Sequence, residues 1–180
     1  MAKELERRVS LICHPSTPGG AVRSIEVLVR RGTAGRLDLR FAVTCDRNRV
    51  RIPAARAARR ADELWRHTCF EAFIAAAGQS GYTELNFSPS GEWASYAFSG
   101  YRAGMAQEAA QSAPVTRLET AARGFELEVS VAAIALAREA PARLALAAVI
   151  EEAGGLCYWA LRHAPGKPDF HHPEGFALEI

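Results

Sequence analysis

The sequence predicts an all-β protein, built as an antiparallel two-sheet β-sandwich of the jelly-roll-like type. Many segments alternate apolar and polar residues, which is the period of a strand. Gly, Pro, Asn and Ser separate these segments, and no regular helical pattern stands between successive strands, as a parallel α/β sheet would require. The length of 180 residues, with 49% hydrophobic residues, predicts one globular domain over residues 1–180.

Four segments show the clearest alternation, with an apolar residue at every second position: Ser24–Arg30, Arg36–Thr44, Tyr82–Ser88 and Phe125–Val131. Successive side chains of a strand point to opposite faces of its sheet, so each segment is predicted to be a half-buried strand. In the third segment, Glu84, Asn86 and Ser88 share one face.

Five further segments complete a prediction of about nine strands. They are Val9–Cys13, Cys69–Ala75, Leu144–Ile150, Leu156–Arg162 and Phe176–Ile180. Two stretches, Ala54–Leu64 and Ala132–Ala140, are each predicted to be either a short helix or an ordered loop. We find no internal repeat and no linker that would divide the chain.

The charge of the chain is nearly balanced, with a formal net charge of +2. This is too small to predict a nucleic-acid or membrane partner from the total alone, and no stretch approaches the roughly 20 apolar residues that cross a bilayer. The N-terminal residues contain no signal-peptide core, and the four cysteines form no Cys-x-x-Cys pair. We therefore expect a cytoplasmic protein with reduced thiols.

Three blocks of sequence contain motifs in addition to an alternation of apolar and polar residues. They are Leu64–Ile74 (LWRHTCFEAFI), Tyr82–Trp93 (YTELNFSPSGEW) and Cys157–Ile180, which begins CYWALRH. Together the blocks resemble the bacterial DOMON-like proteins, a group related to family 9 carbohydrate-binding modules and to the haem- or sugar-binding DOMON domains. The resemblance covers residues 60–180, whereas the first 60 residues agree only in their strand pattern.

The resemblance implies a β-sandwich that binds a small ligand on a polar-faced sheet or its rim, and it implies binding without catalysis. In the carbohydrate-binding relatives, aromatic rings clamp a sugar and polar side chains on adjacent strands bind its hydroxyl groups. Carried onto this chain, the motifs assign binding roles to Trp65, Glu71, Glu84, Asn86 and Ser88. A soluble sugar or a sugar nucleotide is expected rather than a polysaccharide, because the chain shows no export signal and no companion enzyme domain.

The chemistry of a sugar agrees with these residue types. A pyranose ring has apolar C–H faces that pack on an aromatic plane, and its hydroxyl groups need several donors and acceptors. Trp65 and Glu71 share strand parity, so a regular strand would place them on one face. Glu71 interrupts an apolar run, so its carboxylate must be exposed on a sheet face or paired.

Further binding candidates are Trp93, Trp159, Phe170, His171 and His172. Pro168, Pro173 and Gly175 restrict the loop that carries Phe170, and we predict that this loop closes over the same face as Trp65. The alternative is that the aromatic residues fill the core and the two histidines cap turns. For Glu84 and Asn86 the alternative is the solvated face of an antiparallel sheet.

Two other functions stay open. The haem-binding relatives use an axial Met with His or Lys, and Met105 is an internal methionine with His163, His171, His172 or Lys167 as its partner. His67 and Cys69 lie two residues apart, so they could contribute to a zinc site or serve a cysteine-dependent enzyme. Neither a second metal-binding motif nor a third orienting group accompanies them, so no cofactor is expected.

An Arg-rich segment extends from residue 47 to residue 60. Such a segment could attract phosphate-bearing ligands or RNA. It lacks the interleaved aromatic residues of a single-strand binder, so a solvated loop or helix face is expected and no nucleic-acid partner is predicted.

Overall fold

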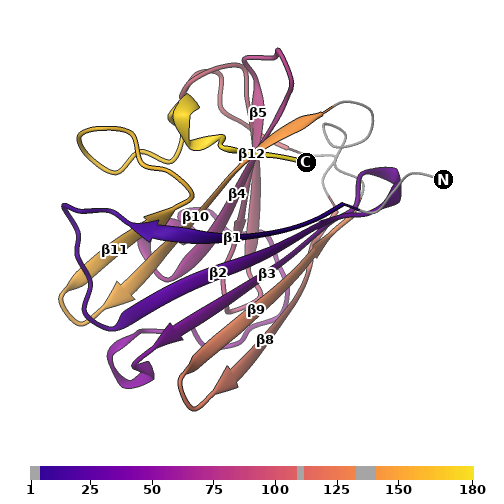
Figure 1. Ribbon diagram of the computed structural model, residues 1–180. Helices are drawn as coiled ribbons and strands as arrows, with labels where there is room; N and C mark the ends of the chain where they lie inside the picture. Colours follow the sequence, from indigo (N-terminus) through magenta and orange to yellow (C-terminus); the bar gives the residue numbers. More distant parts are fainter. Residues whose placement is uncertain (1–4, 109–111, 133–140) are drawn as a thin grey trace.

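The computed structural model describes residues 5–108, 112–132 and 141–180 (Figure 1). In these residues the regular structure consists of strands and short 3-10 turns, and the strands pair in antiparallel fashion. The strands are β1 (Leu5–Cys13), β2 (Val22–Arg31), β3 (Leu37–Cys45), β4 (Cys69–Ala76), β5 (Tyr82–Phe87), β6 (Trp93–Phe98), β7 (Ala106–Gln107), β8 (Val115–Ala121), β9 (Gly124–Val131), β10 (Ala142–Glu152), β11 (Gly155–Ala160) and β12 (Leu178–Glu179). The predicted all-β class is confirmed. No helix in the described residues is long and apolar enough to cross a membrane.

The strands form two layers that are joined through β1. The first layer has the order β1-β2-β3-β9-β8, and the second has the order β7-β6-β5-β4-β10-β11, with β12 paired to the start of β10 (Figure 1). Leu5–Leu11 of β1 pair with β2, whereas Ile12 and Cys13 pair with β11. The predicted two-sheet sandwich is therefore confirmed. Strand β1 is hydrogen-bonded to a strand of each sheet and so joins the two.

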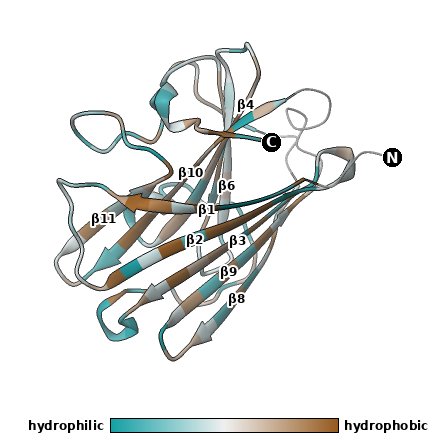
Figure 2. Cartoon of the chain, in the orientation of Figure 1, coloured by the Kyte–Doolittle hydropathy of each residue, from teal (hydrophilic) through white to brown (hydrophobic). Residues whose placement is uncertain are grey.

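The main hydrophobic core lies between the two layers. Strands β2, β3 and β9 alternate apolar and polar residues, which Figure 2 shows as brown and teal bands. Phe41 of β3 packs on Phe70 of β4 with 4.8 Å between ring centroids, and Phe70 also contacts Phe125 of β9. These rings hold the two sheets face to face.

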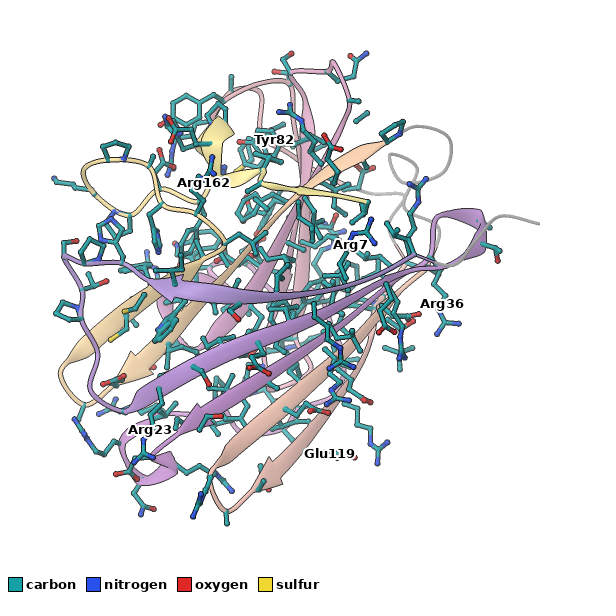
Figure 3. The ribbon with its side chains drawn as sticks, in the orientation of Figure 1. Arg7, Arg23, Arg36, Tyr82, Glu119 and Arg162 are labelled. Atoms are coloured by element: carbon teal, nitrogen blue, oxygen red, sulfur yellow. The ribbon has the colours of Figure 1, made fainter. Side chains whose placement is uncertain are left out.

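The second layer is buried on both of its faces. All residues of β5 and nearly all of β4 are buried. The even-numbered residues Phe70–Ile74 belong to the main core, whereas Phe73 belongs to a second apolar cluster on the outer face. The segment after β11 packs Phe170 against that cluster and so covers part of the outer face. In Figure 3 this segment, in pale yellow, lies beside Tyr82.

The sequence prediction omits three strands, and it makes the last strand longer than it is in the structure. Strands β6, β7 and β8 are not among the predicted segments. Strand β6 is buried on both faces and does not alternate cleanly, whereas β7 has two residues and β8 is largely exposed. The predicted last strand, Phe176–Ile180, is reduced to β12 because the 3-10 turn Pro173–Gly175 (η5) precedes it. Backbone bonds between Ile180 and Ala142 continue its pairing with β10.

The segment Ala54–Leu64 is an extended loop rather than a helix. Its backbone bonds to the turn before β6 and to the edge of β6: Arg56 N–H donates to the Ser90 carbonyl, and Ala61 N–H donates to the Trp93 carbonyl. These bonds satisfy donors that a helix would have satisfied internally. The loop ends in the 3-10 turn Leu64–Arg66 (η3). Most of the other candidate helix, residues 133–140 of Ala132–Ala140, lies outside the described residues.

Candidate ligand-binding site

A pocket of about 380 Å³ lies on the outer face of the second layer, on the side away from the main core. Strands β4 and β5 supply carboxyl groups to it, β6 and β11 supply aromatic rings, and η3 with the loops after β6 and β11 encloses it. Its aromatic residues are Trp65, Tyr96, Phe98, Tyr158 and Phe170, and its polar residues are Glu71, Glu84, Arg102 and His171. The pocket therefore combines ring faces with charged and polar groups, as small-molecule sites do.

Strand register brings the two carboxyl groups together. In the β4–β5 ladder Phe73 lies opposite Glu84, and Glu71 lies opposite Asn86. Residues directly opposite in an antiparallel pair share a face, as do residues two apart on one strand. Glu71 and Glu84 are therefore diagonal neighbours on one face.

Both carboxyl groups are buried. Glu71 is 3% exposed and Glu84 is 5% exposed. Burial, reinforced by the neighbouring Glu84, raises the pKa of Glu71 well above its ordinary value. Burial also raises the pKa of Glu84, although a hydrogen bond from Asn86 and the charge of Arg102 oppose that rise. The Glu71 carboxyl is consequently un-ionised at pH values at which an exposed Glu is charged.

Asn86 is hydrogen-bonded to one of the two carboxyl groups and lies opposite the other in the ladder. Its side-chain amide donates to Glu84 Oε1 at 2.7 Å, and its Oδ1 is buried with no hydrogen-bond partner in the described part of the chain. A protonated Glu71 carries one O–H donor and lies directly opposite Asn86 in the ladder. The neutral form of Glu71 therefore supplies the kind of group that Asn86 Oδ1 lacks.

Aromatic rings form the walls of the pocket. Trp65 stands at the rim, 38% exposed, and meets Tyr96 edge to face at 6.5 Å between ring centroids. The Tyr96 hydroxyl donates to Asp62 at 2.6 Å, which fixes its ring. On the other side, Tyr158 and Phe170 meet edge to face at 5.8 Å.

Two loops close the pocket, and Asp169 ties them together. Arg102, in the loop after β6, donates to Asp169 Oδ1 at 2.7 Å, and the Tyr101 hydroxyl donates to Asp169 Oδ2. Asp169 Oδ1 also accepts the backbone N–H of His171 at 3.1 Å. Burial alone would raise the pKa of Asp169, but these bonds outweigh burial and lower it.

A chain of hydrogen bonds holds the His171 ring in place. The Arg102 backbone N–H donates to the Tyr82 hydroxyl oxygen at 3.3 Å, and the same hydroxyl is hydrogen-bonded to His171 Nδ1 at 2.8 Å. His171 Nε2 lies 3.7 Å from Glu84 Oε2. Burial and the nearby Arg102 lower the pKa of His171 to about 4, so the ring is neutral at physiological pH.

The structure brings together five of the sequence-predicted site residues and separates the others. Trp65, Glu71, Glu84, Phe170 and His171 line the pocket, and Asn86 lies directly behind them. Trp159 points to the opposite face and packs in the main core. Trp93 lies opposite the core residue Phe87, so it also points away from the pocket, and the Arg60 guanidinium lies 4.8 Å from its ring centroid.

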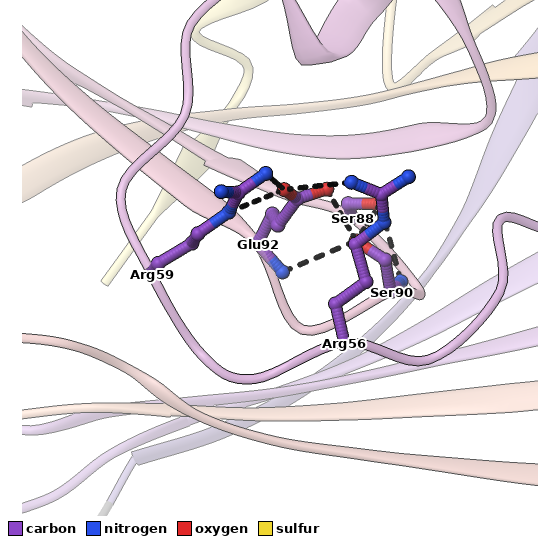
Figure 4. A network of polar contacts seen from close by, with 5 residues as sticks. All are labelled: Arg56, Arg59, Ser88, Ser90 and Glu92. Atoms are coloured by element: carbon purple, nitrogen blue, oxygen red, sulfur yellow. Dashed lines mark hydrogen bonds and ion pairs between the residues drawn. The ribbon is translucent and has the colours of Figure 1, made fainter.

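Ser88 and His172 have local structural roles. The Ser88 hydroxyl oxygen accepts a hydrogen bond from the Ser90 hydroxyl at 2.9 Å, in a turn where Glu92 also pairs with Arg59 and Arg56 (Figure 4). His172 caps η5 by accepting the Glu174 backbone N–H at 3.3 Å. Ser88 and His172 are not among the residues that line the pocket.

Among the aromatic and charged residues of the pocket, sequence reasoning missed Tyr96, Phe98, Arg102 and Tyr158. Tyr96 and Phe98 lie on β6, a strand that was not predicted. Tyr158 is next to the predicted Trp159, and the choice between them depends on which face of β11 points outward. Arg102 lies in the loop after β6 with a φ of 52°. This backbone region favours Gly, so an arginine there gives no sequence signal of its position.

Many arginines of the Arg-rich segment are engaged by protein groups. Arg51 pairs with Glu151, Arg56 and Arg59 pair with Glu92, and Arg60 donates to two backbone carbonyl groups. These contacts fasten the segment to the second layer.

The geometry does not favour a cysteine-dependent enzyme. Cys69 is fully buried, and burial raises the pKa of its thiol well above the ordinary value. His67 Nδ1 is bonded to Glu151 Oε2 at 2.8 Å. The described residues contain no group of three or more His, Cys, Asp or Glu side chains arranged to hold a metal ion.

The residues of the pocket do not fit a haem. Met105 is 60% exposed at the rim, whereas His171 lies inside with Nδ1 bonded to Tyr82 and Nε2 directed toward Glu84. The two side chains therefore do not present a pair of free axial ligands.

Two solved structures are similar to this chain, and the first of them shares its fold. A "putative carbohydrate-binding protein" from Bacteroides uniformis matches with a TM-score of 0.66 and 13% identity, over 95% of this chain and 83% of that chain. A family 9 carbohydrate-binding module from Caldicellulosiruptor kristjanssonii, solved with cellotriose, matches with a TM-score of 0.46 and 10% identity, over 84% of this chain and 75% of that one. No protein-family model and no curated protein sequence matches the chain.

Proposed function

We propose that the pocket on the outer face of the second layer binds a soluble sugar and that the protein acts as a non-catalytic binding protein. The observation that carries this proposal is the combination of aromatic ring faces with buried polar groups whose hydrogen-bonding capacity is not fully used. Ring faces suit the C–H faces of a sugar, and carboxyl and amide groups suit its hydroxyl groups.

The size and charge of the pocket support a mono- or disaccharide. A volume of about 380 Å³ is near the lower end of small-molecule sites. Arg102 is a cation of the lining, and Asp169 already pairs with it. A sugar nucleotide would bring phosphate charges next to two buried carboxyl groups, so a soluble sugar fits better.

The fold comparison supports the same class of ligand at a coarse level. The Bacteroides protein whose fold this chain shares is described as carbohydrate-binding.

Calorimetric titration with a panel of neutral monosaccharides, disaccharides and nucleotide sugars tests the proposal. We expect a soluble sugar to bind and Trp65→Ala to weaken its binding by about fivefold, since one aromatic stacking contact contributes roughly 1 kcal/mol. Trp65→Phe keeps a ring and should retain most of the affinity. Glu26→Gln, on an exposed position of β2, is the control and should bind like the wild type.

Two results would contradict the proposal. One is the absence of binding by every sugar of this panel and by every amino-substituted counterpart of its monosaccharides. The other is a sugar whose affinity is the same in Trp65→Ala as in the wild type, which would place its site elsewhere.

A further inference from the structure

The Glu71 carboxyl has no hydrogen bond or ion pair among the described residues, although it is 97% buried and lines the pocket. Buried carboxyl groups in proteins are normally paired or hydrogen-bonded, because burying one without a partner is costly. An unpartnered acid that faces a cavity is therefore a group with unused binding capacity.

Glu84 adds a second acid to the same wall. One of its oxygens, Oε1, accepts the Asn86 amide, and the other, Oε2, lies 3.7 Å from His171 Nε2, beyond hydrogen-bond distance. Glu71 and Glu84 occupy diagonal positions of the β4–β5 ladder. A single small group between them could contact both carboxyl groups.

The rings of the pocket suit a positive charge as well as a sugar face. A cation above an aromatic face is attracted by the negative potential of the ring, and Trp and Tyr are the strongest partners. Trp65, Tyr96 and Tyr158 line the same cavity as the two acids.

We propose that the sugar bound in this pocket is an amino sugar, whose protonated amino group lies between Glu71 and Glu84. This inference rests on the proposed function and specifies its ligand class. An ammonium group has three N–H donors and no acceptor, which matches two carboxyl groups that have free acceptor positions. An amide or hydroxyl group at the same position would satisfy the acceptors but would not neutralise the charge.

The other charged and titratable groups around Glu71 do not take the place of the ligand amine. They are Cys69 on β4, Tyr82 on β5, Tyr96 on β6, Tyr158 on β11, Arg102 after β6, and Asp169 and His171 after β11. Arg102, the cation of this set, is held at 2.7 Å by Asp169. His171 is bonded through Nδ1 to Tyr82 and is neutral.

Binding of an ammonium group has a proton signature. Burial and the neighbouring Glu84 raise the pKa of Glu71 well above its ordinary value, which favours the protonated acid in the empty pocket. A cation next to the carboxyl reverses that preference, so the amino sugar displaces the Glu71 proton into solvent. A neutral sugar has no such effect, because Glu71 keeps its proton and donates a hydrogen bond to a hydroxyl group of the sugar.

Calorimetry with matched sugars at about pH 6, where amines are fully protonated, tests the inference. The three sets are glucosamine, glucose and N-acetylglucosamine, and the corresponding galactose and mannose sets. We expect the amino sugar of one set to bind at least about tenfold tighter than both neutral members. Titrations in two buffers of different ionisation enthalpy should show net proton release with the amino sugar alone.

Glu71→Gln is the decisive variant, because Gln resembles the neutral acid in shape and should fold normally. It should lose the preference for the amino sugar and the proton release while still binding the neutral sugars. Glu26→Gln is the matched control and should keep both properties.

The outcomes separate this inference from the proposed function. If a neutral sugar binds within tenfold of its amino counterpart, the amino-sugar inference is overturned and sugar binding stands. If Glu71→Gln keeps the preference, the inference is overturned as well. If no sugar of either kind binds, both proposals are overturned.

Discussion

Glu71 and Glu84 are diagonal neighbours on adjacent strands, so ionising both would place two negative charges where water barely reaches. Two features limit this repulsion. The raised pKa of Glu71 favours its neutral form, and Asn86 donates a hydrogen bond to Glu84. His171, neutral and bonded to Tyr82, borders the same acids. The binding chemistry of the pocket depends on these protonation states.

The pKa of His171 gives a prediction at this scale. It falls from 6.5 to about 4 in the folded protein, so between these values the unfolded chain binds more protons than the folded one. The stability that His171 contributes is complete above pH 6.5 and is lost as the pH falls toward 4. We expect an NMR titration to give His171 a midpoint near pH 4, and His171→Gln to flatten the decrease of stability in this window. A His171 midpoint at or above 6.5 would contradict the burial and hydrogen bonding described here.

Sequence parity predicts part of the site at residue resolution. It places Glu84 and Asn86 on one face of their strand, and the structure has that arrangement. It does not distinguish Tyr158 from Trp159, because β11 packs against apolar groups on both faces, with Trp159 in the main core and Ala160 in the outer cluster. A strand that is covered on both faces carries no polar face to indicate which side is outward.

At the scale of elements, the pocket depends on how two loops meet above a rigid sheet. Asp169 accepts hydrogen bonds from Tyr101, Arg102 and the His171 backbone, and few other polar contacts join the two loops among the described residues. The sheet below is fixed by the ladders of β4, β5 and β10. The two loops that Asp169 joins are therefore the part of the site that we expect to open most readily.

Asp169→Ala tests the role of this tie. Loss of the carboxylate removes all three hydrogen bonds, so backbone amides in residues 99–105 and 168–172 should exchange hydrogen faster while those of β4 and β10 do not change. Hydrogen–deuterium exchange measured by mass spectrometry gives this result directly. Asp38→Ala, which removes an exposed pair with Arg36, is the control. Equal exchange in both loops for Asp169→Ala and the wild type would show that the loops are held by other contacts.

The turn between β8 and β9 gives a second prediction for elements. Gly124 has a φ of +151°, and a Cβ at this position would lie 1.8 Å from the carbonyl oxygen of Val43. Gly124→Ala must displace backbone in the first layer, and we expect it to lower the free energy of unfolding by more than about 2 kcal/mol. Gly154→Ala is the matched control, because nothing lies within 4 Å of its Cβ position. Urea denaturation measures both, and equal stabilities of the two variants would contradict the clash.

Alternation of apolar and polar residues predicts some of the strands and misses others. Alternation predicts β2, β3 and β9 because one face of each is core and the other is polar. It misses β6, which is buried on both faces. The loop at Ala54–Leu64 has the composition of a helix, yet its backbone bonds to β6 instead. Such tertiary hydrogen bonds override local preference and leave no mark in the sequence.

At the scale of the whole molecule, the two sheets share one core and one bridging strand. Phe41 and Phe125 of the first layer contact Phe70 of the second, and β1 pairs with both sheets. Neither sheet can lose its partner without exposing this core. We therefore predict that the chain unfolds as one cooperative unit, in agreement with a single domain over residues 1–180.

Two probes of urea unfolding test this prediction. Trp65 and Trp93 lie next to and in the second layer, and Trp159 packs in the main core, so their fluorescence reports the second layer and the core face that it shares with the first. Far-ultraviolet circular dichroism reports the strands of both layers. The two transitions should coincide, whereas a separate dichroism step at lower urea would show that the first layer unfolds on its own.

We propose that a sugar binds in the pocket between the outer face of the second layer and its two loops. The most direct measurement is a two-dimensional ¹H–¹⁵N NMR titration of the protein with the sugar that binds most tightly. We predict shifts of the Trp65 indole and of the backbone amides of Glu71, Glu84 and His171, with β2, β3 and β9 unchanged. Shifts confined to the first layer or to the Arg-rich loop, with the pocket signals unmoved, would contradict the claim.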